Sequence, residues 1–258
     1  MTTLCIVQAR YDSSRLPGKV AEPILGVPIL VGILRRLQRA TLLDEIVVAT
    51  TTSSSDDLVV ALAGAAGVEV ARGSVFDVLD RFHQVVQARP EVDVVVRVTG
   101  DCPFVDPGIV DLVISRLSET AADFAANRLP PPFQRTYPVG LDVEVCTRAA
   151  IDQAWAQAER AHQREHVMPF LYEEPGRFAV EIVDLEDDLS AYRWTVDTPD
   201  DLEAVRQLAA LAGPEPFDWT RVLEVARAHP ELAAINSFQR QKLVSETDSR
   251  WRLGDSGH

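Results

Sequence analysis

Short apolar runs that alternate with segments of helical periodicity are the feature that most restricts how this chain can fold. Apolar runs at residues 4–7, 46–49, 68–71 and 92–98 have the length of buried strands. Helical periodicity is found between and after them, at residues 29–40, 55–66, 75–88 and 107–117. This order is typical of βαβ units around a parallel sheet, and we therefore predict an α/β fold.

The second half of the chain has a different pattern. We expect strands at residues 123–126, 141–146, 178–183 and 192–196, and helices at residues 148–163, 165–173, 199–211 and 219–228. Prolines predict a loop at residues 129–139, which is a candidate lid. We predict one domain over residues 1–235, with a lid or dimerisation insertion at about 127–175. The polar residues 236–258 are expected to form a flexible tail or to dock on another subunit.

Charge and composition exclude several classes of partner. The formal net charge of the 258 residues is -14, which argues against binding to nucleic acid or to an anionic membrane. The longest uncharged apolar run, at residues 58–68, is too short to span a bilayer, and we find no signal peptide. Cys5, Cys102 and Cys146 lack CxxC spacing and fit reduced thiols. We therefore expect a cytoplasmic protein.

A cationic loop follows the first predicted strand. Arg10, Arg15 and Lys19 stand there with Ser14 and Gly18, and Lys19 is one of only two lysines. A positive loop with hydroxyl groups at the carboxyl end of such a strand can receive a polyphosphate, so nucleotide binding is the leading hypothesis. The alternative without a ligand is a surface turn with solvated cations.

Two familiar phosphate-binding motifs are missing from this loop. A Walker P-loop would need glycine where Ser13 stands and a hydroxyl residue where Val20 stands, so this class of NTPase is rejected. No Gly-x-Gly-x-x-Gly follows any predicted strand, which removes the main support for a dinucleotide-dependent dehydrogenase. A longer loop remains, whose N-H groups and cations would bind the phosphates together.

Aspartates end two other predicted strands. Asp101 follows Thr99 and Gly100 after the run at 92–98, and Asp197 follows the run at 192–196. Either acid alone could belong to a turn or to the start of a helix. Both are expected at the sheet edge that carries the cationic loop, and we therefore predict that they form a Mg²⁺ pair.

Six motifs resemble those of the cytidylyltransferase family. They are Gln-Ala-Arg-x-x-Ser-x-Arg-Leu-Pro-Gly-Lys (8–19), Arg-Gly-Ser-x-x-Asp-Val-Leu-Asp-Arg (72–81), Val-Thr-Gly-Asp-Cys-Pro (98–103), Gly-Leu-Asp-Val-Glu (140–144), Arg-Glu-His-Val (164–167) and Arg-Trp-Thr-Val-Asp-Thr-Pro (193–199). The chain is most similar to the branch labelled spore coat polysaccharide biosynthesis, which is related to the synthetases of CMP-sialic acid and CMP-Kdo. The resemblance implies a Rossmann-like mixed, mostly parallel sheet of the nucleotide-diphospho-sugar transferase type, CTP as donor, Mg²⁺ as cofactor and a homodimer.

The resemblance also implies roles for individual residues. Arg10 and Lys19 are the expected catalytic cations, and Asp101 and Asp197 the metal ligands. The expected nucleotide-binding residues are Gln8, Ala9, Arg10, Ser14, Arg15, Gly18, Lys19, Arg72, Gly73, Thr99, Gly100 and Asp101. Those expected to bind the acceptor are Arg135, Asp142, Glu144, Arg164 and His166. The function implied is transfer of CMP from CTP to a small anionic acceptor, a sugar acid, sugar phosphate or phosphonate, with release of pyrophosphate. Asp12 departs from the usual loop pattern by adding a negative charge.

Three alternatives stay open. His162, Glu165 and His166 match the His-x-x-Glu-His pattern of a zinc peptidase, although no motif marks a third ligand. A regulator could bind CTP without turnover, and would then release no pyrophosphate. A sugar transferase that uses a finished nucleotide sugar could share the fold, although no Asp-x-Asp ends a strand.

Overall fold

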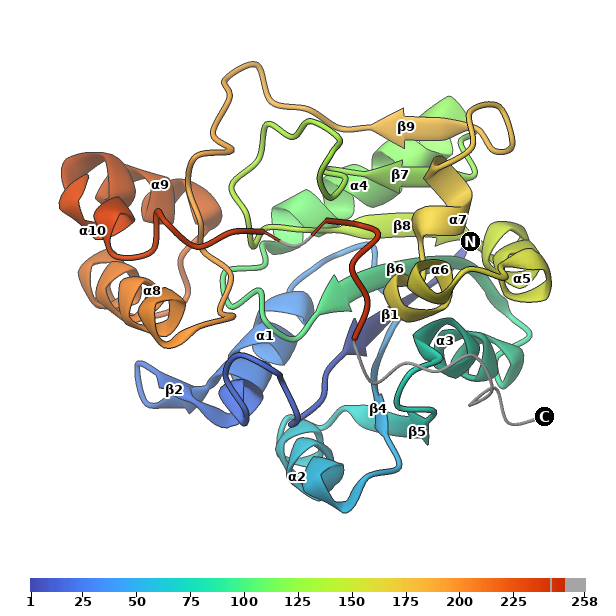
Figure 1. Ribbon diagram of the computed structural model, residues 1–258, viewed down its shortest axis with the longest axis horizontal. Coiled ribbons are helices and arrows are strands. Elements are labelled where there is room, and N and C mark those ends of the chain that lie inside the picture. Colours follow the sequence, from blue (N-terminus) through green and yellow to red (C-terminus); the bar gives the residue numbers. More distant parts are fainter. Residues whose placement is uncertain (242, 249–258) are drawn as a thin grey trace.

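A seven-stranded sheet forms the centre of the protein. We describe it from a computed structural model, which covers residues 1–241 and 243–248 (Figure 1). The strand order is β5-β4-β1-β6-β8-β7-β9. Strands β1, β4, β5 and β6 are mutually parallel, β7 is parallel to β9, and β8 runs antiparallel to both neighbours. The predicted mixed, mostly parallel sheet is therefore confirmed. The strands are β1 (Thr2–Gln8), β4 (Glu45–Thr51), β5 (Glu69–Gly73), β6 (Val92–Thr99), β7 (Phe124–Ala126), β8 (Glu144–Thr147) and β9 (Val180–Ile182).

Helices contribute to a hydrophobic core on each side of this sheet. One core includes α1 (Ile29–Leu37), α2 (Asp57–Ala65), α4 (Pro107–Thr120), α8 (Pro199–Ala212) and α9 (Trp219–Ala228). The other includes α3 (Val78–Gln87), α5 (Arg148–Gln157) and α7 (Pro169–Tyr172). The short elements are η1 (Lys19–Ala21), β2 (Pro23–Ile24), β3 (Val27–Pro28), η2 (Ser54–Asp56), α6 (Ala161–His166) and α10 (Glu231–Ala234).

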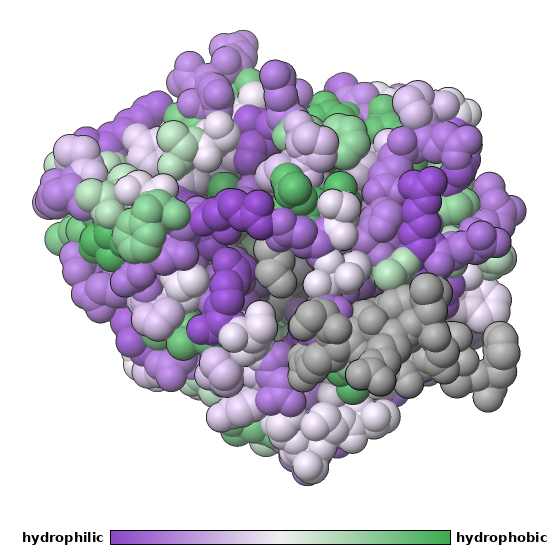
Figure 2. Space-filling view, viewed as in Figure 1, coloured by the Kyte–Doolittle hydropathy of each residue, from purple (hydrophilic) through white to green (hydrophobic). Residues whose placement is uncertain are grey.

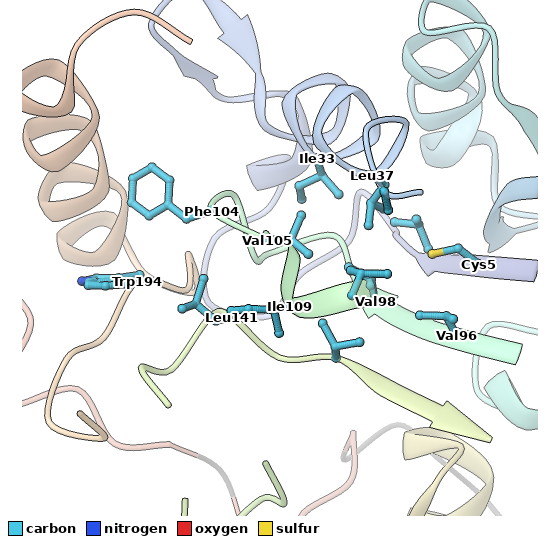
Figure 3. Packing of buried hydrophobic residues seen from close by; sticks show 14 of the residues in the cluster. Cys5, Ile33, Leu37, Val96, Val98, Phe104, Val105, Ile109, Leu141 and Trp194 are labelled. Atoms are coloured by element: carbon cyan, nitrogen blue, oxygen red, sulfur yellow. The ribbon is translucent and has the colours of Figure 1, made fainter. Parts of the chain in front are cut away.

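Strand β6 shows why the sheet needs helices on both faces. Val96 and Val98 belong to the core with α1, whereas Val95 belongs to the core with α3. Figure 3 shows Val96 and Val98 close to Cys5 of β1, with Ile33 and Leu37 of α1 above them. Successive side chains of a strand point to opposite faces, so a strand with buried valines on both faces must be covered twice.

The carboxyl ends of β1 and β6 meet at one edge of the sheet. Gln8 pairs with Thr99 in the register of these strands, and the Gly100 N-H donates to the Gln8 carbonyl over 2.8 Å. A Cβ on Gly100 would lie 3.0 Å from the Ala9 Cβ. The absence of a side chain at Gly100 thus lets the loops after the two strands approach closely.

The strand predicted at residues 192–196 is wrong. Arg193 makes only an isolated bridge with Val139. The segment is extended, but its N-H groups bond to loops: Trp194 donates to Val139 over 2.7 Å, and Val196 donates to Asp101 over 2.8 Å. These bonds hold the segment beside the end of β6 without a strand ladder.

Other boundaries differ from the predictions. The helix expected at 148–163 is split into α5 and α6, and the one expected at 165–173 is interrupted at Val167, whose φ is 71°. The strand expected at 141–146 begins only at Glu144, and the hairpin of β2 and β3 was not predicted. Short-range bonds and tight turns decide these positions, and apolar periodicity does not reveal them.

The loop at 129–139 and the described part of the tail lie side by side. The loop at 129–139 is irregular, as predicted. The described part of the tail, residues 236–241 and 243–248, folds back on its own chain, where the Val244 N-H donates to the Pro131 carbonyl over 3.1 Å. Within the described ranges, no helix combines the length and hydropathy needed to cross a bilayer.

Candidate active site

A cleft of about 280 Å³ opens at the carboxyl edge of β1 and β6. The face of the molecule drawn in Figure 2 is dominated by hydrophilic side chains. The predicted site residues that line the cleft are Gln8, Ala9, Arg10, Ser14, Arg15, Lys19, Thr99, Gly100, Asp101, Asp142, Glu144, His166 and Asp197. The predicted residues that do not line it are Gly18, Arg72, Gly73, Arg135 and Arg164.

Lys19 joins the two aspartates in this cleft. Its Nζ donates to Asp101 Oδ2 over 2.8 Å, to Asp197 Oδ1 over 2.9 Å and to the Val196 carbonyl over 2.8 Å. Only about 10% of the Lys19 side chain is exposed. The cationic loop and two acids from distant parts of the chain therefore meet at one point.

Mutual attraction keeps this group charged. Burial by itself would lower the pKa of Lys19, but Asp101 and Asp197 outweigh burial and raise that pKa above its ordinary value. Burial would likewise raise the pKa of Asp101, yet the Lys19 ammonium and its hydrogen bond lower it. At neutral pH the lysine is an ammonium and Asp101 a carboxylate.

Two arginines contact Asp197. Asp197 Oδ2 lies 2.9 Å from Arg15 Nη2 in an ion pair and accepts a hydrogen bond from Arg193 Nη2 at 3.1 Å. Arg193 also binds the buried Asp201, its Nε lying 2.8 Å from Oδ1. Arg10 Nη2 lies 3.5 Å from Asp248 Oδ2 of the tail. Arg193 was missed as a site residue, although it opens the motif that ends in Asp197.

Local hydrogen bonds shape the cationic loop. Gly18 has a φ of 77°, and its N-H donates to the Tyr11 carbonyl over 2.8 Å. The Tyr11 N-H in turn donates to Asp56 Oδ1 over 2.6 Å. Asp12, the residue that departs from the family pattern, accepts a hydrogen bond from Ser55 Oγ at 3.0 Å. Its carboxylate thus ties the loop to the segment that begins α2.

Three arginines and two carboxylates line or support the other end of the cleft. Asp142 Oδ2 lies 3.1 Å from Arg128 Nε, and its Oδ1 accepts from Arg135. Glu144 accepts from Arg97, whose Nη2 also donates to Gln8 Oε1 over 3.0 Å. Burial would raise the pKa of Asp142, but Arg128 and Arg135 lower it.

Two of these arginines were missed as site residues. Arg97 interrupts the apolar run of β6, and such a position could have signalled an inward-facing charge. Arg128 gives no signal in the sequence, because only the fold brings it next to Asp142.

Other predicted residues are engaged elsewhere. Arg72 bonds to the Thr51 carbonyl at 2.8 Å and the Ser53 carbonyl at 2.6 Å, and it pairs with Asp57. It therefore braces the segment between β4 and α2. Arg164 donates to Asp77 at the start of α3, with Nη2 2.6 Å from Oδ2. These contacts position neighbouring segments, and neither side chain reaches the cleft.

The geometry does not favour the zinc site. His162 Nε2 pairs with Glu173 Oε1 at 2.7 Å, whereas His166 Nε2 contacts the Glu246 carbonyl at 2.9 Å. The parts of the chain that the structure describes contain no group of three or more His, Cys, Asp or Glu placed to hold a metal ion. A peptidase site would need such a third ligand.

Comparisons with known proteins identify the family of the chain. A cytidylyltransferase family model matches residues 4–230. The spore coat polysaccharide biosynthesis protein SpsF of Bacillus subtilis is 33% identical, over 89% of this chain and 96% of its own. A solved cytidylyltransferase of Leptospira borgpetersenii has a TM-score of 0.85 and 31% identity, over 94% of this chain and 99% of that one. A CMP:2-keto-3-deoxy-manno-octonic acid synthetase complexed with CTP shares the fold, with a TM-score of 0.61 and 20% identity over 81% and 99% of the two chains.

Proposed function

The chain belongs to the cytidylyltransferase family and is a nucleotidyltransferase, and from this premise we propose that it transfers CMP from CTP to a small anionic acceptor. The observation that carries this proposal is the convergence of Lys19, Asp101 and Asp197 in the cleft. Cations and metal-binding carboxylates in one place are what phosphoryl-type transfer requires, because its transition state needs charge stabilisation more than covalent help. The acceptor would be a sugar acid, sugar phosphate or phosphonate.

In the proposed reaction, an oxyanion of the acceptor attacks the α-phosphorus of CTP. A bond forms between that oxygen and phosphorus, the bond to the bridging oxygen breaks, and pyrophosphate leaves with its electron pair. Arg10, Arg15 and Lys19 would neutralise the negative charge of the triphosphate and of the leaving group. Gln8, Ala9 and Ser14 on the cationic loop, and Thr99 and Gly100 at the end of β6, would hold the nucleotide. Gly18 would act through the loop conformation that its positive φ permits.

The two aspartates fit a divalent cation. Their oxygens converge on one point beside Lys19 Nζ, and two neighbouring carboxylates are a donor set of oxygen atoms with negative charge. Mg²⁺ favours oxygen ligands and is commonly held by one or two carboxylates together with substrate phosphates. We propose Mg²⁺ on Asp101 and Asp197, where it would supply positive charge to the phosphate oxygens.

Neither Arg72 nor Gly73 lines the cleft. Their proposed role near the base or ribose is therefore indirect: they would support the segment between β4 and α2. Arg164 similarly supports the start of α3. Arg135, Asp142, Glu144 and His166 remain the proposed acceptor end.

We also propose a homodimer in the cytoplasm, with one domain at residues 1–235 and an insertion at about 127–175 that acts as lid or dimer contact. Positions 242 and 249–258 of the predicted tail lie outside the described residues. The family resemblance supports the dimer. Sedimentation equilibrium tests it, and a monomer at micromolar concentration would contradict it.

A matrix of the four nucleoside triphosphates against sugar acids, sugar phosphates and phosphonates tests the function. We expect pyrophosphate release with CTP and one acceptor class, and only in the presence of Mg²⁺. A protein that binds CTP but releases no pyrophosphate with any acceptor would be a regulator, and the proposal would be wrong.

A further inference from the structure

We propose that Arg128 binds an anionic group of the acceptor and that Asp142 is the positioning residue that orients it. This inference rests on the proposed function and names the contact that selects the acceptor. It follows from the polar atoms beside Asp142 and Glu144, some of which already have a partner within the protein and some of which do not.

The carboxylates are the engaged groups. Asp142 contacts Arg128 through one oxygen and Arg135 through the other. Glu144, of which only about 5% of the side chain is exposed, is paired with Arg97. Both acids were expected to bind the acceptor, but Asp142 contacts arginines through both of its oxygens and Glu144 contacts Arg97 through Oε2. Their role is therefore orientation of the arginines.

The three arginines differ in which of their N-H groups lack a hydrogen-bond partner. Arg97 gives Nη1 to Glu144 and Nη2 to Gln8, and Arg135 gives Nη2 to Asp142 and Nη1 to Gln241. Arg128 Nε lies 3.1 Å from Asp142 Oδ2 as an ion pair but has no hydrogen-bond partner, and the two Nη groups likewise have none among residues 1–241 and 243–248. Arg128 lines the cleft, and its Nη atoms are not among the buried atoms without a partner. They are thus open to the cleft.

The charges at this end favour an anion. Arg97, Arg128 and Arg135 carry three positive charges against two negative charges on Asp142 and Glu144. The surplus positive charge lies in a chain whose formal net charge is -14. A guanidinium with two free N-H groups binds a carboxylate or phosphonate in a bidentate manner, which lysine cannot reproduce. The ligand would be an acceptor with an anionic group at this position.

The test compares an acceptor acid with its neutral analogue. With CTP and Mg²⁺, the wild-type protein should have a KM for the most active sugar acid roughly 10- to 100-fold below that for its carboxamide, the range expected for hydrogen bonds to a charged group. Arg128→Met should raise the KM for the acid by about that factor and remove the preference. Arg128→Lys should retain only part of the preference for the acid, because lysine lacks the planar pair of N-H donors of a guanidinium group. Arg116→Met, which removes an arginine that does not line the cleft, is the matched control.

Binding measurements separate this inference from the proposed function. Methylphosphonate should bind the CTP-loaded wild-type protein in a ³¹P NMR titration and should bind Arg128→Met at least tenfold more weakly, whether or not any acceptor is turned over. The CTP affinity of Arg128→Met should stay within about twofold of wild type, which also shows that the variant is folded. Asp142→Asn should raise the KM for the acid but keep the preference over the carboxamide, since Arg128 keeps its charge. An Arg128→Met variant that still prefers the acid, or still binds methylphosphonate normally, would overturn the inference.

Discussion

The Lys19 ammonium lies 2.8 Å from the Asp101 carboxylate, although 82 positions separate these residues in the chain. The pairing depends on two loops that follow neighbouring parallel strands, β1 and β6. It also places a nearly buried cation beside a carboxylate that is about one-quarter exposed to the cleft. A substrate phosphate and a metal ion could both reach this pair.

Asp101→Asn should lower kcat by at least about 10²-fold, because the variant removes a charge that the proposed transition state needs. The variant should keep its fold, since asparagine can still accept a hydrogen bond from Lys19. Pyrophosphate release and circular dichroism measure the two properties. Glu203→Gln, on the exposed face of α8, is the control. Full turnover by Asp101→Asn would remove this carboxylate from the mechanism.

The stability contributed by Lys19 should depend on pH at both ends of the range. The pKa of Asp101 is lowered from 3.8, so its contribution is present above that value and is lost as pH falls through the folded-state pKa. The pKa of Lys19 is raised from 10.5, so its contribution is present below that value and is lost as pH rises through the folded-state pKa.

Urea unfolding of wild type and Lys19→Met between about pH 3 and 11 measures this effect. The difference in the free energy of unfolding should be largest between about pH 5 and 9 and should shrink toward both extremes. In Lys19→Met, Asp101 and Asp197 remain without the ammonium between them, and acid relieves their repulsion. A difference that is constant across the range would contradict the ion pair.

Gly140→Ala should destabilise the protein by about 3 kcal/mol or more. Gly140 has a φ of 105°, and a Cβ there would lie 2.5 Å from the Thr195 nitrogen and 2.6 Å from the Trp194 carbonyl carbon. The clash would also displace the segment that presents Asp197. Gly64→Ala in α2 is the matched control: its Cβ would meet nothing within 4 Å, so stability should rise by about 0.5–1 kcal/mol. Thermal unfolding distinguishes the two, and equal effects would contradict the packing described.

Asp248→Asn should tighten CTP binding by about two- to fivefold, because the Asp248 carboxylate lies 3.5 Å from Arg10, a proposed triphosphate ligand. A partly exposed ion pair is weak, so the effect should fade as ionic strength rises. Isothermal titration of CTP at low and high salt measures it. Unchanged affinity at low salt would mean that Arg10 does not need to leave the tail to bind the nucleotide.

Sequence periodicity located most strands and helices correctly, because buried strands and amphipathic helices repeat with fixed periods. It failed where hydrogen bonds join loops. Residues 192–196 are extended, with apolar side chains in alternation as in a strand, but the N-H groups of Trp194 and Val196 bond to Val139 and Asp101. Residue pattern alone does not reveal such partners.

The candidate site shows the same division. The sequence by itself determined the α/β class, the cationic loop after the first strand and the aspartates at the ends of two extended segments, since each follows from local order along the chain. Only the tertiary structure decided that Lys19 joins both aspartates, that Asp142 and Glu144 are occupied by arginines, and that Arg128 is left open. Those facts depend on distances between segments far apart in the chain, and such distances are set by how the sheet and its loops pack.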